Sequence, residues 1–151
     1  MGYAIDTPAV AEYNIRMDIP AAKAVFEANW IHGFAFTPLD SCAIVKLEGE
    51  LYKKLKESSN PAILSLIQNY ALWLKSRGEW KEEIEESTVL FDAVAVYMAF
   101  ANDLLVMEEL PIKVTDEGFT AVDESARTVS VATGWKDMKS FNQLLVDILL
   151  S

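Results

Sequence analysis

A carboxylate and a carboxamide stand two residues apart near the start of the chain, at Glu12 and Asn14. If this stretch is extended, both side chains point to one side and Tyr13 points to the other. A carboxylate accepts hydrogen bonds and an amide both donates and accepts them, so the pair could hold two adjacent hydroxyls of a sugar. A polar loop ahead of an ordinary capped helix explains the same residues without a ligand, and the spacing alone does not decide between the two interpretations.

The elements that would position this pair begin with a predicted helix at residues 18–29, for which Asp18 is a suitable N-cap and Pro20 falls in the first turn. The next residues predict a strand at 30–38, a helix within 39–47 that begins at an Asp40 or Ser41 cap, and a helix at 48–56. Two further helices are predicted, one from an Asn60 cap to about Gly78 and one from Ser87 or Thr88 to about 102. The remainder predicts strands at 105–109, 112–115, 119–122 and 128–132 and a last helix at 137–150.

This alternation predicts the α/β class, with residues 1–151 forming a single unit in which helices pack on a mixed sheet. Asp116-Glu117-Gly118 has the composition of a hairpin turn. The last helix is expected to bury one face, made of Phe141, Leu144, Leu145, Ile148 and Leu149. The acidic run at 82–86 is expected to lie at the surface.

The composition excludes some classes of partner. Hydrophobic residues make up 52% of the 151 residues, which is far more than a disordered chain carries. Lys and Arg number 13 against 23 Asp and Glu, so a broad basic face for nucleic acid or for an anionic membrane is not expected. We therefore expect neither partner.

Cys42 and His32 are each the single residue of their type. One cysteine forms no internal disulfide, which fits a reducing compartment and predicts a cytoplasmic protein. His32 is expected to be structural, and it is the one histidine that a Cys42 nucleophile could use, so nucleophilic catalysis by Cys42 is not expected. Asp40 follows the predicted strand at 30–38, where capping the next helix is the expected role.

Three segments resemble the nucleoside hydrolase family, whose members are calcium-dependent N-ribohydrolases typified by the inosine/uridine-preferring enzymes. The first runs from Ala11-Glu12-Tyr13-Asn14 through an apolar helix at 18–26, the second is residues 30–40, and the third is 88–95. They occur in the family's order and, with the segment from 112 to 150, cover nearly the whole chain. The resemblance implies part of a Rossmann-like nucleoside hydrolase fold and hydrolysis of the N-glycosidic bond of ribonucleosides.

The resemblance also implies roles for individual residues. Glu12 and Asn14 match the family's ribose-binding residues, and Asp92 matches a calcium ligand. Asp6 stands where the family usually has a sugar-contacting Asn. Phe91 stands where the best-known members have a histidine that protonates the leaving base, and because Phe donates no proton, it is expected to stack on a base or sugar face instead.

The Asp-rich motif DxDxGxDD, which in the family supplies most calcium ligands and the residue that activates water, does not occur in these 151 residues. No residue of this chain is therefore assigned a catalytic role. We expect the C-terminal portion of a nucleoside hydrolase, inactive alone, with calcium belonging to the intact fold and not bound tightly by this chain. A homo-oligomer or a partner subunit would cover the missing half.

Two alternatives stay open. Phe91 in place of histidine fits a hydrolase-like protein that acts on another sugar derivative. A non-catalytic interaction module is the second alternative, because the high apolar fraction suits a chain that pairs with a partner subunit or with itself.

Overall fold

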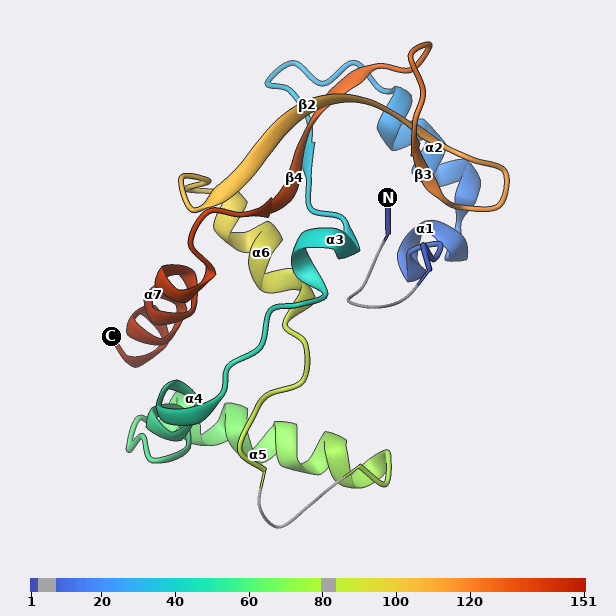
Figure 1. Ribbon diagram of the computed structural model, residues 1–151. Coiled ribbons are helices and arrows are strands. Elements are labelled where there is room, and N and C mark those ends of the chain that lie inside the picture. The colour runs from blue at the N-terminus through green and yellow to red at the C-terminus, as the bar shows by residue number, and fades with distance from the viewer. Residues whose placement is uncertain (3–7, 80–83) are drawn as a thin grey trace. The chain divides into compact units, whose positions relative to one another are not determined.

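The structure is a computed structural model that describes residues 1–2, 8–79 and 84–151 (Figure 1). Its helices are α1 (Tyr13–Met17), α2 (Ile19–Glu27), α3 (Leu39–Cys42), α4 (Gly49–Lys56), α5 (Pro61–Ser76), α6 (Phe91–Met98) and α7 (Met138–Leu150). Its strands are β1 (Ala35–Phe36), β2 (Leu105–Val114), β3 (Thr120–Val122) and β4 (Thr128–Trp135). The predicted α/β class is confirmed.

The chain divides into two compact units, which are described separately. The sheet unit comprises Met1–Val45 and Val89–Asp137, and the helical unit comprises Lys46–Thr88 and Met138–Ser151. The prediction that residues 1–151 form a single α/β unit stays a prediction.

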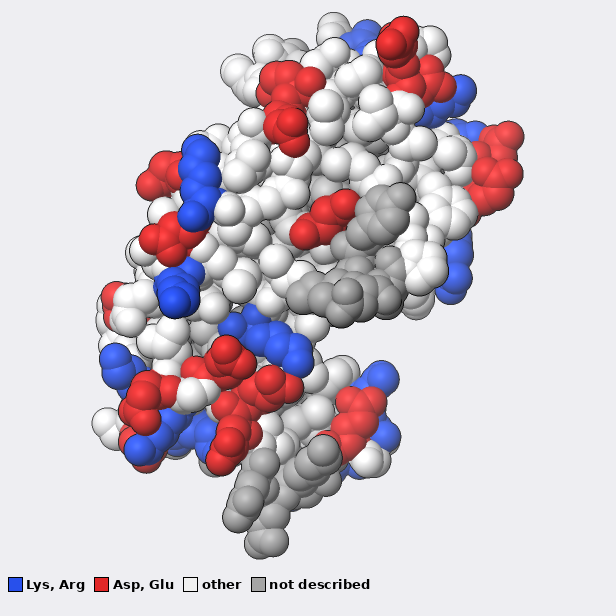
Figure 2. Space-filling model, in the orientation of Figure 1, with Lys and Arg blue, Asp and Glu red and all other residues white. Residues whose placement is uncertain are grey.

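On the side drawn in Figure 2, the described Lys and Arg side chains are scattered among Asp and Glu side chains. A search of the described residues finds no helix that is both long and apolar enough to span a lipid bilayer. Glu82 and Glu83 of the predicted acidic surface run lie outside the described residues, whereas Glu85 and Glu86 are exposed as expected.

The sheet unit is built on a mixed sheet of strand order β1-β4-β2-β3. β1 pairs with β4 in parallel, whereas β4 with β2 and β2 with β3 are antiparallel. Helix α2 packs on β2 and helix α3 packs on β4. The core beneath the sheet is made of Phe26, Ile112, Val114, Val129 and Val131. The Phe26 ring meets those of Phe34 and Phe36 edge-on, each at a centroid distance of 5.1 Å.

Strand β2 runs unbroken through Pro111, although the sequence predicted two separate strands on either side of this residue. The prediction was wrong because β2 changes its partner there: Leu105–Pro111 pair with β4, and Ile112–Val114 pair with β3. Pro111 lacks an N–H, but its carbonyl still accepts a hydrogen bond from the Asp123 N–H at 2.9 Å. The strand therefore tolerates a proline at the point of exchange.

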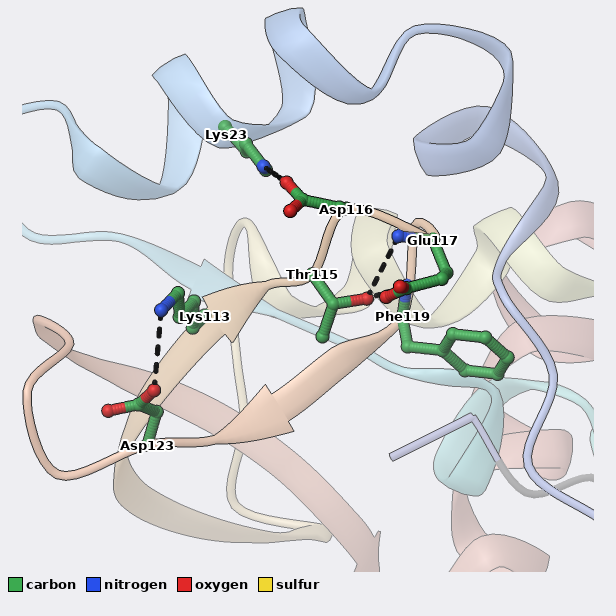
Figure 3. Close-up of polar contacts among 7 residues, drawn as sticks. All are labelled: Lys23, Lys113, Thr115, Asp116, Glu117, Phe119 and Asp123. Carbon is green, nitrogen blue, oxygen red and sulfur yellow. Dashed lines mark hydrogen bonds and ion pairs between the residues drawn. The ribbon is translucent and has the colours of Figure 1, made fainter.

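The hairpin between β2 and β3 confirms the turn predicted at residues 116–118. The Thr115 hydroxyl oxygen accepts hydrogen bonds from the N–H groups of Glu117 and Phe119 (Figure 3). Lys23 of α2 forms an ion pair with Asp116 at the tip of the turn, and this contact lowers the pKa of the Asp116 carboxyl below its ordinary value. The hairpin is thereby joined to α2.

Several element boundaries in the sheet unit differ from the predictions. The strand predicted at 30–38 is reduced to β1, because residues 30–33 form a turn in which the Gly33 N–H bonds to the Trp30 carbonyl. Helix α3 begins after Pro38 rather than at an Asp40 or Ser41 cap. The helix predicted from Ser87 or Thr88 begins only at Phe91, and the Leu90 N–H bonds to the Val45 carbonyl.

The helical unit consists of α4, α5 and α7. Helix α5 begins at the predicted Asn60 cap, whose side chain accepts a hydrogen bond from the Ala62 N–H at 2.9 Å. Helix α7 packs on α4. Its predicted face was partly wrong: Phe141 is buried, but Val146 is buried as well and Ile148 is 51% exposed. A contact with one neighbouring helix covers a narrower stripe than the sequence pattern suggested.

We expect Gly118→Ala to lower the free energy of unfolding by at least about 1–2 kcal/mol, since the left-handed backbone disfavours a Cβ by that amount. Gly118 has φ of +83°, and a Cβ there would lie 3.4 Å from Arg16 Cα and from the Ile19 side chain. Urea denaturation would measure the loss.

Gly33→Ala is the matched control, because Gly33 has the same φ of +83° and nothing lies within 4 Å of its Cβ position. It should carry the backbone cost alone. Equal losses in the two variants would contradict a packing role for Gly118.

Candidate functional site

A cleft of about 720 Å³ opens within the sheet unit. Helix α1, strand β1, helix α3 and the first turn of α6 contribute to its walls. The described lining includes residues 10–16 and 35–39 together with Gly2, Phe26, Cys42, Phe91, Asp92, Ala95 and Thr120. Four of the predicted site residues, Glu12, Asn14, Phe91 and Asp92, therefore lie around one cavity, although Phe91 follows Asn14 by 77 positions in the sequence. Asp6, the fifth, lies outside the described residues.

Glu12 and Asn14 come together through helix capping rather than through an extended strand. Glu12 is the N-cap of α1, with φ of −62° and ψ of 143°, and its Oε2 accepts a hydrogen bond from the Ile15 N–H at 3.1 Å. Asn14 lies inside α1 and donates from Nδ2 to Glu12 Oε1 at 3.2 Å. An extended backbone at residues 12–14, the arrangement considered from the sequence, was wrong. The chain turns into α1 there, because the Glu12 side chain satisfies a free N–H of the first helical turn.

Phe91 and Asp92 are the first two residues of α6. Leu90, at the N-cap, makes no side-chain capping bond, so the first turn of α6 presents N–H groups without a side-chain cap. A carboxylate in this turn is stabilised by the positive end of the helix dipole, which suits Asp92. Phe91 is 46% exposed and belongs to the lining of the cleft, so part of its side chain is accessible.

Cys42 lies at the end of α3 and lines the cleft, with only 6% of its surface exposed. Burial raises the pKa of its thiol from 9.0 to about 11, and the negative charges of Glu12 and Asp92 add to this rise. A thiol with so high a pKa stays protonated at neutral pH and is a poor nucleophile. The expectation that Cys42 is not a nucleophile agrees with this environment.

Two further candidates lie elsewhere. His32 is exposed in the turn at 30–33 rather than within an apolar strand, and it does not belong to the described lining of the cleft. Asp40 does not cap α3, since Pro38 occupies that position. Its Oδ2 instead accepts a hydrogen bond from the Gly2 N–H at 2.6 Å, which ties the start of the chain to α3.

Sequence reasoning missed Tyr13 and Arg16 as lining residues of the cleft. Both belong to the five-residue helix α1, where the sequence predicts a polar loop or an extended segment. A weak signal for it is the four-residue spacing of Ile15 and Ile19, which suits one face of a helix, and both residues pack against the core. Helical spacing places Tyr13 and Arg16 on neighbouring positions of one face.

The donor atoms in the cleft do not fit the calcium ion that the family resemblance implies. Calcium takes six to eight oxygen ligands. Among the described residues there is no group of three or more His, Cys, Asp or Glu side chains that could hold a metal ion. Both Glu12 oxygens already accept hydrogen bonds, and Asp92 offers a single carboxylate. No step of the chemistry below is therefore assigned to calcium.

The sequence model of the family described as inosine-uridine preferring nucleoside hydrolase matches residues 1–143 of the 151. A search of curated proteins finds no match. The family match confirms the resemblance drawn from the three sequence segments.

The Cys42 thiol is expected to react slowly with a thiol reagent such as iodoacetamide in the folded chain. A pKa raised from 9.0 to about 11 lowers the thiolate fraction at pH 8 by about a hundredfold, and burial slows the reagent further. The rate in the folded chain, compared with the rate in the chain unfolded in urea, measures this difference. Similar rates in both states would contradict the buried, neutral thiol.

Proposed function

The chain belongs to the inosine-uridine preferring nucleoside hydrolase family, and from this premise we propose that its cleft binds a nucleoside through the ribose. Family membership supports a nucleoside hydrolase-like function in general. One observation carries the more specific proposal: four residues matched to the family's site, Glu12, Asn14, Phe91 and Asp92, line the same cavity.

Glu12 and Asn14 are the proposed contacts to the sugar. Adjacent ribose hydroxyls need both acceptors and donors, and a carboxylate beside an amide supplies them. The bond from the Asn14 amide to Glu12 Oε1 and the bond from the Ile15 N–H to Glu12 Oε2 hold the carboxylate in place before a ligand arrives. A group held in this way loses little conformational freedom on binding.

Cleavage of the N-glycosidic bond passes through a ribosyl group with positive character. An enzyme for this reaction holds the sugar, stabilises that charge and delivers water. The carboxylates of Glu12 and Asp92 contribute negative potential in the cleft. Because the described donors do not fit calcium, we propose that this chain binds the sugar and does not by itself hydrolyse nucleosides at an appreciable rate.

A second candidate is a hydrolase-like protein for another sugar derivative. Phe91 supports it, since this residue replaces the histidine that protonates the leaving base in the best-known members. A phenyl ring can stack on a base or a sugar face, but it cannot donate a proton.

Binding of inosine and uridine by calorimetry tests the sugar-binding role. We expect both nucleosides to bind, and their 2′,3′-dideoxy analogues to bind at least about tenfold more weakly, because a hydrogen bond to a charged group contributes about 1.5–3 kcal/mol.

Glu12→Gln, which keeps an acceptor for the Ile15 N–H, should weaken nucleoside binding to a similar extent. Glu108→Gln is the matched control, since Glu108 is exposed on β2 and does not line the cleft. Equal affinity for the dideoxy analogues would overturn the assignment of Glu12.

The proposed lack of activity is tested separately, with the purified chain incubated with inosine or uridine in excess calcium. We expect no ribose release in a reducing-sugar assay and no tight calcium binding by calorimetry, because the described donors do not form a site. Ribose release that scales with protein concentration and is lost in Asp92→Asn would contradict this part of the proposal.

A further inference from the structure

A second hollow of the sheet unit lies beside α2 and β2, apart from the cleft. Its volume is about 320 Å³, which is enough for a small ligand. Its floor is apolar, because the buried core residues Phe26, Ile112 and Val114 line it. The loop at 125–127, just before β4, adds a further wall. We call it the α2–β2 hollow, and in the described lining it shares only Phe26 with the cleft.

The charge of this hollow is opposite to that of the chain. Lys23, Lys113 and Arg127 belong to its described lining, and Glu27 is the one carboxylate among the same residues. The chain as a whole carries 13 Lys and Arg against 23 Asp and Glu. Cations gathered in a hollow that is partly walled by apolar residues raise the local concentration of anions.

Arg127 keeps both its charge and part of its hydrogen-bonding capacity available. Its Nη1 donates to Asn29 Oδ1 at 3.2 Å, and this acceptor is neutral. In the described part of the chain, no carboxylate forms an ion pair with Arg127. A guanidinium has five N–H donors, so donors beyond the bond to Asn29 remain for a ligand.

The two lysines are paired with aspartates that do not belong to the described lining of the hollow (Figure 3). Lys23 pairs with Asp116, whose side chain is 88% exposed. Lys113 lies 3.5 Å from Asp123 Oδ2, while Asp123 Oδ1 accepts hydrogen bonds from the Ser125 N–H and hydroxyl. Exposed ion pairs contribute little to stability, so an anion in the hollow can share both lysines at small cost.

A phosphate group suits these donors better than a carboxylate does. The planar fork of an arginine donates two parallel hydrogen bonds to a phosphate, and a lysine binds it as a point charge. A phosphate monoester carries nearly two negative charges at neutral pH, so it gains from several cations at once. The apolar floor adds contact for a hydrocarbon or aromatic group joined to the phosphate.

We propose that the α2–β2 hollow binds a phosphate group, with Arg127 as the main contact and Lys23 and Lys113 as further positive charges. The ligand is free phosphate or the phosphate monoester of a small apolar or aromatic group, since both present the same anion. Glu27 opposes the anion and limits the affinity. This site is separate from the proposed nucleoside site and does not depend on it.

Titration of the full chain with inorganic phosphate and with phenyl phosphate tests the site. Calorimetry near neutral pH and at low ionic strength should show saturable binding of phenyl phosphate, at least threefold tighter than that of inorganic phosphate, because the phenyl group meets the apolar floor. Sodium chloride at matched ionic strength controls for charge screening. In NMR spectra, the amide signals of residues 112–114 and 125–127 should shift on binding, and those of α5 should not.

Variants identify the residues responsible. Arg127→Gln should weaken the binding of phenyl phosphate at least tenfold, because it removes the charged fork. Glu27→Gln should tighten binding at least twofold, and a gain of affinity is not the result that a misfolded chain would give. Arg77→Gln and Glu108→Gln are the matched controls, since both residues are exposed and neither lines the hollow, so both variants should bind as the wild type does.

Each outcome decides the proposal. Tighter binding of phenyl phosphate that depends on Arg127 supports a monoester as the ligand. Equal binding of the two probes that depends on Arg127 supports the site with free phosphate as its ligand. Absence of saturable binding, or binding that Arg127→Gln and Glu27→Gln both leave unchanged, overturns the proposal. If Arg127→Gln does not fold, the Glu27→Gln titration and the map of shifted amides still decide it.

Discussion

The pairing of β4 with neighbours on both sides is the constraint on which the sheet unit depends. It is parallel to β1 and antiparallel to β2, and its Val129 and Val131 enter the core. The indole N–H of Trp135, the last residue of β4, donates to the Ser41 carbonyl at 2.8 Å and so fixes α3 against the sheet. β4 therefore holds two of the walls of the cleft, β1 and α3, in place.

Helix ends then place the polar groups on that scaffold. Glu12 is oriented because it caps α1, and Asp92 is oriented because α6 begins one residue before it. Both are local consequences of free N–H groups in a first helical turn. The same property that stabilises each helix end therefore supplies a carboxylate to the cleft. Burial is the main cause of the raised pKa of the Cys42 thiol, and these two carboxylates add to it.

The family match and the side chains that line the cleft agree only in part. Glu12 and Asn14, the proposed contacts to a sugar, line the cleft, whereas the described lining residues provide neither a calcium donor set nor a histidine. What the cleft retains is suited to recognition: an acceptor and a donor for hydroxyls, an exposed aromatic ring at Phe91 and excess negative charge.

The sequence by itself determined the family, the α/β class and the capped helices α2 and α5, because these rest on local signals such as Asp18 and Asn60 and on ordered motifs. It did not determine the capping role of Glu12, the continuity of β2 through Pro111 or the late start of α6. Each of these depends on partners distant along the chain: Pro111 lies where β2 exchanges β4 for β3, and the Leu90 N–H bonds to the Val45 carbonyl. Only the tertiary structure decided that Glu12 and Asp92 share one cavity. The contacts of α1 with α2 and of α6 with α3, and the packing of α2 and α3 on the sheet, bring them together, which spacing along the chain does not show.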